Sequence, residues 1–334
     1  MPERIASSVV VITGASGGVG RATAREFAKN GYKVALLARG EEGLEGARRD
    51  VEALGGQALV IKTDVSDYTQ VENAAQQVEK ELGSIDIWVN NAMQNVFSSF
   101  DQIKAKEFER VVDVTFLGMV YGTMVALKRM KPRNRGTIIL VGSALAYRGL
   151  PLQSAYCASK HATNGFFDSV RAELLHDKSD VHLTIVHPSA VNTTQFNWVK
   201  SYLPKKSKPI GKIYQPEVPA RAIYYAAHHK RRSVTVGTAP LQTSLSNAFI
   251  PGTLDRILAK IGYSGQQTDQ PENFNRPDNL WEPIAEDRGA HGSFDNEAKE
   301  NSLELEAATH RGMAAALVAG VALGIAGLVY LSRS

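Results

Sequence analysis

Short apolar runs recur along the chain, and a longer stretch with helical spacing follows most of them. The runs lie at residues 8–12, 33–38, 58–64, 85–92, 136–143, 181–188 and 233–237. The helical stretches lie at residues 19–30, 41–54, 68–82, 104–130, 152–176 and 217–229. Runs rich in β-branched residues are typical of parallel strands buried on both faces. The alternation predicts an α/β fold with a doubly wound, Rossmann-type parallel sheet of about seven strands.

The chain changes character near residue 264. Residues 264–311 are polar, contain prolines and glycines, and hold few aliphatic side chains. Such a composition is typical of segments that build no core of their own. We therefore predict a folded domain over residues 1–263 and a polar, partly disordered linker over residues 264–312, with Trp281 docking part of the linker onto the domain.

An uncharged stretch follows the linker. Residues 313–331 contain no charged side chain, and a helix of that length would be about 28 Å long, close to the thickness of a hydrocarbon core. We predict one transmembrane helix over residues 313–331, in which Gly320 and Gly324 would let two such helices pair. In the alternative, the tail packs on a partner protein and the chain stays soluble.

Composition and charge narrow the setting further. The 334 residues are 43% hydrophobic and 22% charged, which is ordinary globular usage. A net charge of +4 is modest for this length and does not argue for nucleic acid. The single cysteine, Cys157, excludes an intramolecular disulfide and fits a reducing compartment. The first residues lack the long apolar core of a secretory signal peptide.

A glycine-rich turn, TGASGGVG at residues 13–20, joins the first predicted strand to the first predicted helix. The spacing of three of its glycines lets a backbone turn tightly and approach a pyrophosphate. The helix N-terminus beyond the turn offers free N–H groups and the positive end of a dipole. Because the motif lies between a strand and a helix, it predicts a dinucleotide site. The residues expected at this site are Gly14, Ser16, Gly18, Val19 and Gly20.

The end of the second strand indicates which dinucleotide is preferred. A carboxylate there would bind the ribose 2′-hydroxyl and repel a 2′-phosphate, but this chain has Ala38 followed by Arg39. A guanidinium suits a phosphate, so the sequence favours NADP(H). In the alternative, Arg39 faces solvent and Glu41 or Glu42 supplies the ribose contact.

Three side chains with complementary chemistry are predicted to meet at one edge of the sheet. Ser143 ends the fifth strand, Tyr156 lies thirteen residues later, and Lys160 lies one helical turn beyond Tyr156. Ligands bind open α/β sheets at the carboxyl ends of the strands. We therefore expect the three groups to converge beside the dinucleotide.

With the glycine turn and these three residues, the region 8–240 resembles the short-chain dehydrogenase/reductase family. The matching stretches are TGASGGVG, Asp64 after the third strand, NNA at 90–92, Ser143, YCASK at 156–160 and PSAVNT at 188–193. The resemblance implies a nicotinamide cofactor and hydride transfer to or from a carbonyl/alcohol substrate.

The resemblance also implies roles for individual residues. Tyr156 would be the general acid/base, Ser143 would orient the substrate oxygen, and Lys160 would bind the nicotinamide ribose. Asp64 would contact adenine, and Asn90 would steady the central sheet and the cofactor. Further cofactor-binding residues implied by the matching stretches are Ala92, Pro188, Val191 and Thr193.

Three positions depart from the family pattern. Thr115 replaces an asparagine that helps hold a water between the lysine and solvent, and we count it as a catalytic position. Met93 replaces the glycine that commonly follows NNA, and Ser189 replaces the glycine that follows Pro188. Because Thr115 affects the proton relay and Met93 narrows the space near the cofactor, a membrane-scaffolded NADP(H) sensor with little turnover is the rival hypothesis.

Electrostatics gives a specific expectation for the tyrosine. The pKa of a free tyrosine is about 10, which is high for a base at neutral pH. We expect the Lys160 ammonium and an oxidised nicotinamide to lower the pKa of Tyr156. His182 and His187 lie five apart on one strand without cysteine or carboxylate partners, so we predict no metal site.

The segment after PSAVNT is expected to cover the substrate. Its apolar side chains favour a hydrophobic substrate such as a lipid-like ketone, an alcohol or a steroid, although they could simply pack on the domain. We predict an oxidoreductase tethered by its C-terminus, with its domain on the cytoplasmic side and with homo-oligomers possible. The apolar residues in question are Phe196, Trp198, Tyr202, Leu203 and Ile213.

Overall fold

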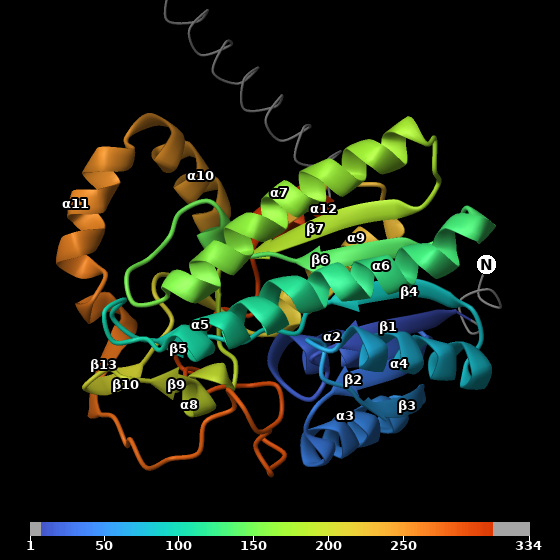
Figure 1. The fold of residues 1–334 in the computed structure, drawn as a ribbon, viewed down its shortest axis with the longest axis horizontal. Helices are drawn as coiled ribbons and strands as arrows, with labels where there is room; N and C mark the ends of the chain where they lie inside the picture. The colour runs from blue at the N-terminus through green and yellow to red at the C-terminus, as the bar shows by residue number, and fades with distance from the viewer. Residues whose placement is uncertain (1–7, 310–334) are drawn as a thin grey trace, which may run out of the picture.

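The computed structural model describes residues 8–309, and a seven-stranded parallel sheet forms its centre (Figure 1). The strands follow the order β12-β7-β6-β4-β1-β2-β3, so the chain reverses its direction of travel between β1 and β4. The predicted Rossmann-type parallel sheet is confirmed. The strands are β1 (Val9–Thr13), β2 (Lys33–Ala38), β3 (Gln57–Lys62), β4 (Ile85–Asn90), β6 (Thr137–Val141), β7 (His182–Pro188) and β12 (Ser233–Val236).

Helices cover both faces of the sheet (Figure 1). One face carries α2 (Gly18–Lys29), α3 (Glu41–Ala53) and α9 (Glu217–His228). The other face carries α4 (Tyr68–Glu81), α6 (Gly118–Met130) and α7 (Ser154–His176). Because both faces are covered, every residue of β1 is buried, which explains its unbroken apolar sequence.

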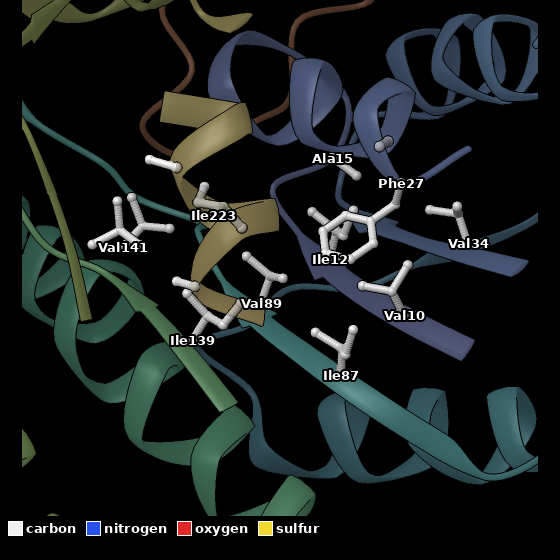
Figure 2. Close-up of a cluster of buried hydrophobic side chains, with 14 of the residues drawn as sticks. Val10, Ile12, Ala15, Phe27, Val34, Ile87, Val89, Ile139, Val141 and Ile223 are labelled. Atoms are coloured by element: carbon white, nitrogen blue, oxygen red, sulfur yellow. The ribbon is translucent and has the colours of Figure 1, made fainter. Parts of the chain in front are cut away.

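Figure 2 shows the apolar layer between the sheet and the first group of helices. Ile12 of β1 and Val89 of β4 lie on this face, and both are fully buried. Phe27 of α2 and Ile223 of α9 pack onto them from the helical layer. Replacing a buried phenylalanine such as Phe27 by alanine costs about 3–5 kcal/mol of unfolding free energy. This layer fixes the position of the sheet edge where the site lies.

The predicted helix over residues 104–130 is interrupted. It consists of α5 (Ala105–Val112), a π-helical turn η1 (Asp113–Leu117) and α6. Within the described part of the chain, the stretch Ala105–Arg133 is the one helical region long and apolar enough to cross a bilayer, and its apolar window is half buried. Since it packs on β4 and α7, it belongs to the core of the domain.

Two helices, α10 (Ala239–Phe249) and α11 (Pro251–Ile261), follow the last strand and are absent from the sequence prediction. They form a projecting hairpin at one end of the molecule (Figure 1). Three two-stranded ribbons are added near the carboxyl edge of the main sheet. They pair β5 (Val96–Phe97) with β9 (Lys200–Ser201), β8 (Ala190–Val191) with β11 (Ile213–Tyr214), and β10 (Lys205–Ser207) with β13 (Gln267–Pro271).

The segment 264–309 differs from the expected partly disordered linker, because it packs back onto the domain. It begins with η4 (Ser264–Gln266) and β13 and ends with α12 (Leu303–Thr309). Leu280 is fully buried, whereas Trp281 is 49% exposed, so Leu280 rather than Trp281 docks the segment. The segment can pack on the domain with few aliphatic residues because many of its contacts with the domain are hydrogen bonds to main-chain carbonyls. The predicted transmembrane helix 313–331 lies outside the described residues.

Candidate active site

A cavity of about 400 Å³ lies along the carboxyl edge of the sheet, at the reversal point between β1 and β4. Most of the residues predicted for the site line it. Three do not: Gly20, Asn90 and Thr115 are absent from its wall. The predicted residues that line the cavity are Gly14, Ser16, Gly18, Val19, Arg39, Asp64, Ala92, Ser143, Tyr156, Lys160, Pro188, Val191 and Thr193.

The glycine turn is shaped by close backbone approach. Gly14 has a φ of +68°, and a Cβ there would lie 2.9 Å from the Cα of Ala92. A Cβ at Gly20 would overlap the carbonyl oxygen of Gly14, so Gly20 allows α2 to pack against the turn instead of lining the cavity. Only glycine meets both demands. The turn therefore brings its backbone to the cavity wall, where the Gly18 N–H donates to the carbonyl oxygen of Gly289 at 3.4 Å.

The two asparagines of the NNA motif have different roles: the bonds of Asn90 agree with its expected role in steadying the sheet, but Asn90 does not line the cavity. The Asn90 side chain accepts a bond from Trp88 Nε1 at 3.0 Å and donates to Thr123 Oγ1 at 3.1 Å, deep in the sheet. Asn91 lines the cavity, and its Nδ2 donates to the carbonyl oxygen of Thr13 at 2.9 Å. Asn91 thus holds the glycine turn, a role that sequence reasoning missed although the motif contains it.

Arg39 lies at the adenosine end of the cavity, as the end of β2 predicts. Its guanidinium donates to three main-chain carbonyls, at 2.6 Å to Trp281, at 3.4 Å to Leu280, and to Asn279. No ion pair joins it to a carboxylate within residues 8–309. Burial and the nearby Arg110 charge lower the pKa of Arg39. The hydrogen-bond partners of Arg39 are thus neutral, while the carboxylates of Asp64 and Glu282 act on its charge from nearby.

Asp64 follows β3 beside this arginine. Burial alone would raise the pKa of its carboxyl, but hydrogen bonds from Arg110 and Ser66 outweigh burial and lower it. Arg110 Nη2 lies 2.6 Å from Asp64 Oδ2, and Ser66 Oγ donates to Oδ1 at 2.7 Å. Asp64 is therefore an ionised acceptor in a fixed orientation at the cavity wall.

Ser143, Tyr156 and Lys160 converge on one wall, from the end of β6 and the first turns of α7. The Lys160 ammonium lies 5.6 Å from the centre of the Tyr156 ring. Lys160 is 2% exposed, and its Nζ donates to the carbonyl oxygen of Val141 at 2.7 Å. Burial lowers the pKa of Lys160 to about 7. The ammonium is thus poorly solvated and close to its titration point at neutral pH.

The pKa of Tyr156 moves in the opposite direction from the expectation. Burial raises it to about 12, and a hydrogen bond with the Ser143 side chain offsets only part of that rise. The phenol is therefore neutral at pH 7 in the protein alone. A neutral phenol held by a serine hydroxyl is arranged to donate a proton, as a general acid does.

Thr115, predicted as a catalytic position, is absent from the cavity wall, and its side chain bonds to Gln94. Its Oγ1 donates to the carbonyl oxygen of Gln94 at 2.9 Å and accepts from the Gln94 N–H at the same distance. The residue is fully buried within η1. Its hydroxyl therefore holds the loop that follows NNA, and the catalytic role of Thr115 stays a prediction.

His187 contributes to the site in a way that its sequence position did not reveal. Its Nδ1 lies 3.3 Å from the main-chain nitrogen of Ser143 and 3.2 Å from the Ser143 carbonyl oxygen. Burial lowers the pKa of His187 to about 4, so the imidazole is neutral. A neutral ring can accept the Ser143 N–H and so fix the backbone that carries the serine hydroxyl.

The far side of the cavity is partly apolar, and the segment after PSAVNT supplies only part of it. Phe196 and Trp198 line the cavity. Leu203 and Ile213 are 4% exposed and pack on the domain, while Tyr202 donates its hydroxyl to Glu107 at 2.7 Å. The five apolar residues are thus divided between the two alternatives that the sequence left open. Cavity residues that the prediction omitted include Asn95, Leu150, Gln153, Ile210 and Thr243.

These features together define a dinucleotide-binding α/β protein in which a serine, a tyrosine and a lysine line the same cavity. A family model described as short chain dehydrogenase matches residues 8–201. The chain belongs to the short-chain dehydrogenase/reductase family, and it is an oxidoreductase. The residues fit a nicotinamide dinucleotide, since the glycine turn, the positively charged Arg39 and the ionised Asp64 all line the cavity.

Individual relatives extend the comparison over different lengths of the chain. Uncharacterized oxidoreductase YxnA of Bacillus subtilis (strain 168) is 33% identical over 323 residues, 96% of this chain and 90% of the relative. The 3-dehydrosphinganine reductase of Danio rerio is 31% identical and covers 66% of this chain and 69% of its own. The crystal structure of an alcohol dehydrogenase from Thermococcus sibiricus with 5-hydroxy-NADP superimposes with a TM-score of 0.59 at 27% identity, covering 69% of this chain and 95% of that one.

Proposed function

We propose that the protein is an NADP(H)-dependent reductase of a hydrophobic ketone, acting at a membrane. The observation that carries the proposal is that the Ser143 and Tyr156 side chains line the same cavity as the apolar side chains of Phe196 and Trp198. Two hydroxyl groups in a cavity that also has apolar side chains suit the carbonyl group of a hydrophobic substrate.

The chemistry requires a proton donor at the carbonyl oxygen. Tyr156 is neutral at pH 7 because its pKa is about 12, and the Ser143 hydroxyl fixes the direction of the phenol. A bound nicotinamide supplies the hydride to the carbonyl carbon. Proton transfer from Tyr156 then neutralises the developing alkoxide. The Lys160 ammonium, held by the Val141 carbonyl, stabilises the phenolate that remains.

The NADP(H) preference rests on Arg39. Its guanidinium lies at the adenosine end of the cavity, and its partners within the described residues are neutral carbonyls. A 2′-phosphate would give Arg39 a charged hydrogen-bond partner, and a guanidinium binds phosphate with two parallel hydrogen bonds. The related alcohol dehydrogenase from Thermococcus sibiricus was solved with an NADP derivative, which agrees with this preference.

The substrate class rests on the apolar cavity wall and on one relative. The Danio rerio protein is named a reductase of 3-dehydrosphinganine, and it shares 31% identity with this chain. We infer a long-chain ketone as the substrate class.

The membrane location rests on two observations. The uncharged stretch 313–331 is long enough to span a bilayer. In addition, α10 and α11 expose an unusual number of large apolar side chains, and both α10 and α12 pack at the β12 edge of the sheet. We propose that this hairpin faces the lipid, with the catalytic domain on the cytoplasmic side. The exposed residues are Leu241, Leu245, Phe249, Ile250, Ile257, Ile261 and Tyr263.

A substrate panel tests the proposal. The full chain in detergent is mixed with NADPH or NADH and with ketones of increasing alkyl length, and cofactor absorbance is followed. We expect NADPH to be oxidised faster than NADH, and kcat/KM to rise with chain length. Tight NADPH binding without turnover of any ketone would favour the sensor hypothesis, which the commitment of the Thr115 hydroxyl to Gln94 keeps open.

A further inference from the structure

The segment 279–289, which we call the strap, crosses the adenosine half of the cavity. The three carbonyls that hold Arg39 belong to its first residues. The same carbonyls accept from two further side chains: Gln94 Nε2 donates to Asn279 at 2.6 Å, and Arg110 Nε donates to Leu280 at 3.2 Å. The strap thus connects the end of β2 with the NNA loop and with α5.

The C-terminal half of the strap reaches the glycine turn. Asp287 forms an ion pair with Arg21 of α2, whose side chain is 6% exposed. The carbonyl oxygen of Gly289 accepts from the Gly18 N–H at 3.4 Å, at the N-terminus of the same helix. The strap therefore spans from the predicted 2′-phosphate position to the predicted pyrophosphate position.

The strap also forms part of the cavity wall. Asn279, Pro283, Ile284 and Glu286 line the cavity opposite the sheet edge. Leu280 anchors the strap in an apolar cluster that contains Val96 and Val111 and against which Tyr156 packs. A ligand lying along the sheet edge would therefore be covered by the strap.

Charges of both signs lie around Arg39: burial and Arg110 lower its pKa, while Asp64 and Glu282 act in the other direction. Arg39 and Arg110 approach the same strap carbonyls, and their mutual repulsion contributes to the lowered pKa of Arg39. One carboxylate, Asp64, forms an ion pair with Arg110, while Arg39 bonds to uncharged oxygens. The carbonyls fix the direction of the Arg39 fork without cancelling its charge.

We propose that the strap is a component of the cofactor site: it positions Arg39 toward the adenosine 2′-phosphate, and it opens for the cofactor to enter and leave. The proposal rests on the NADP(H) function proposed above. It assigns cofactor specificity to main-chain carbonyls near residue 280 as well as to the side chain at the end of β2.

A reversible crosslink tests the opening step. A Cβ built at Gly40 lies 3.2 Å from the Cβ of Pro283, so Gly40→Cys with Pro283→Cys needs a shift of a few tenths of an ångström to reach disulfide geometry. Gly40 has a φ of −86°, which any residue adopts. The one native thiol, Cys157, is buried and its pKa is raised to about 11, so it does not interfere.

The measurement is NADPH fluorescence in a stopped-flow instrument, with crosslinking verified by mass. We expect the oxidised double variant to bind and release NADPH at least tenfold more slowly than the same protein after reduction. Equal rates in both states would overturn the opening step. Wild-type protein that binds NADH but not NADPH would refute the proposed cofactor instead, and the crosslink comparison is then made with NADH.

A second variant tests the positioning of Arg39. Leu280→Ala removes the apolar anchor of the strap, and Leu303→Ala, at a position 83% exposed, is the matched control. We expect the Kd for NADPH to rise at least fivefold in Leu280→Ala, the Kd for NADH to change less than twofold, and the control to resemble wild type. Equal losses for both dinucleotides would refute a role in 2′-phosphate selection.

Discussion

At Tyr156, burial and hydrogen bonding act in opposite directions, and burial is the stronger. The sequence suggests that a nearby ammonium lowers the pKa of the phenol, but it cannot show how little solvent reaches the pair. In the folded chain the pKa of Tyr156 rises to about 12 and that of Lys160 falls to about 7. Both shifts disfavour the charged forms, which suits a phenol that begins the reaction as a proton donor.

Lys160 gives the site a pH dependence. Because its pKa in the folded protein is about 7, its ammonium is present below pH 7 and is lost as the pH rises through that value. If the charge supports reduction, kcat/KM for NADPH, which reports the free enzyme, should fall up to tenfold per pH unit above pH 7. A flat profile from pH 6 to pH 9 would contradict the role of the ammonium.

Arg39 should determine the choice of dinucleotide. Arg39→Gln keeps a hydrogen-bond donor for the strap carbonyls but removes the charge, so we expect the Kd for NADPH to rise at least tenfold and the Kd for NADH to change little. Arg48→Gln, which removes a surface arginine paired with Glu45 and Glu52, is the matched control. Fluorescence titration of each variant with NADPH and with NADH measures the two Kd values. Unchanged NADPH affinity would place the 2′-phosphate elsewhere.

At the scale of elements, the sheet could be predicted from the sequence because each of its strands is an apolar run of its own. The predicted range 33–38 coincides with β2, and 181–188 differs from β7 by one residue. Side chains at strand ends, such as Ser143 and Arg39, could then be placed at one edge. These side chains come together because the carboxyl ends of all strands in a parallel sheet lie at the same edge.

Other elements could not be predicted, for identifiable physical reasons. The strap has no periodic pattern, and its contacts are main-chain oxygens accepting from distant arginines. No residue of α11 is buried. The apolar positions of this helix therefore do not mark a face that packs into the core of the domain. The interruption of the helix at η1 is associated with Thr115, whose partner Gln94 is 21 positions away.

The packing of α2 on the glycine turn can be tested with two helical glycines. A Cβ at Gly20 would overlap the Gly14 carbonyl, whereas one at Gly165 in α7 meets open space. We expect Gly20→Ala to lower the melting temperature by several degrees and to abolish dinucleotide binding, because the turn must shift. Gly165→Ala should raise stability by about 0.5–1 kcal/mol. Thermal unfolding that ranks the two variants the other way would refute the packing argument.

At the scale of the whole molecule, seven of the fifteen large hydrophobic side chains exposed within residues 8–309 lie on the hairpin of α10 and α11 or at its ends. Phe249 is 80% exposed and Leu241 is 60% exposed, which is unusual for a surface that meets only water. The cavity extends to the base of this hairpin, where Ala239 and Thr243 line it. A hydrophobic substrate entering from lipid would therefore have a short path to the catalytic wall.

Membrane attachment can be tested with the full chain expressed in cells. If residues 313–331 span a bilayer, the protein remains in the membrane pellet after an alkaline carbonate wash. Protease added to sealed vesicles of known orientation then reports the side on which the domain lies, and we expect the cytoplasmic side. Complete release of the protein by carbonate would favour a tail that packs on a partner protein.

The central claim is that Tyr156 donates the proton during hydride transfer to a ketone. The most direct test compares wild-type protein with Tyr156→Phe, which keeps the ring in its partly buried position but removes the hydroxyl. NADPH affinity is measured by fluorescence, and ketone-dependent NADPH oxidation is measured by absorbance. The account predicts a loss of about 10²–10⁴ in kcat with NADPH affinity changed less than threefold. Turnover within a few-fold of wild type would contradict it.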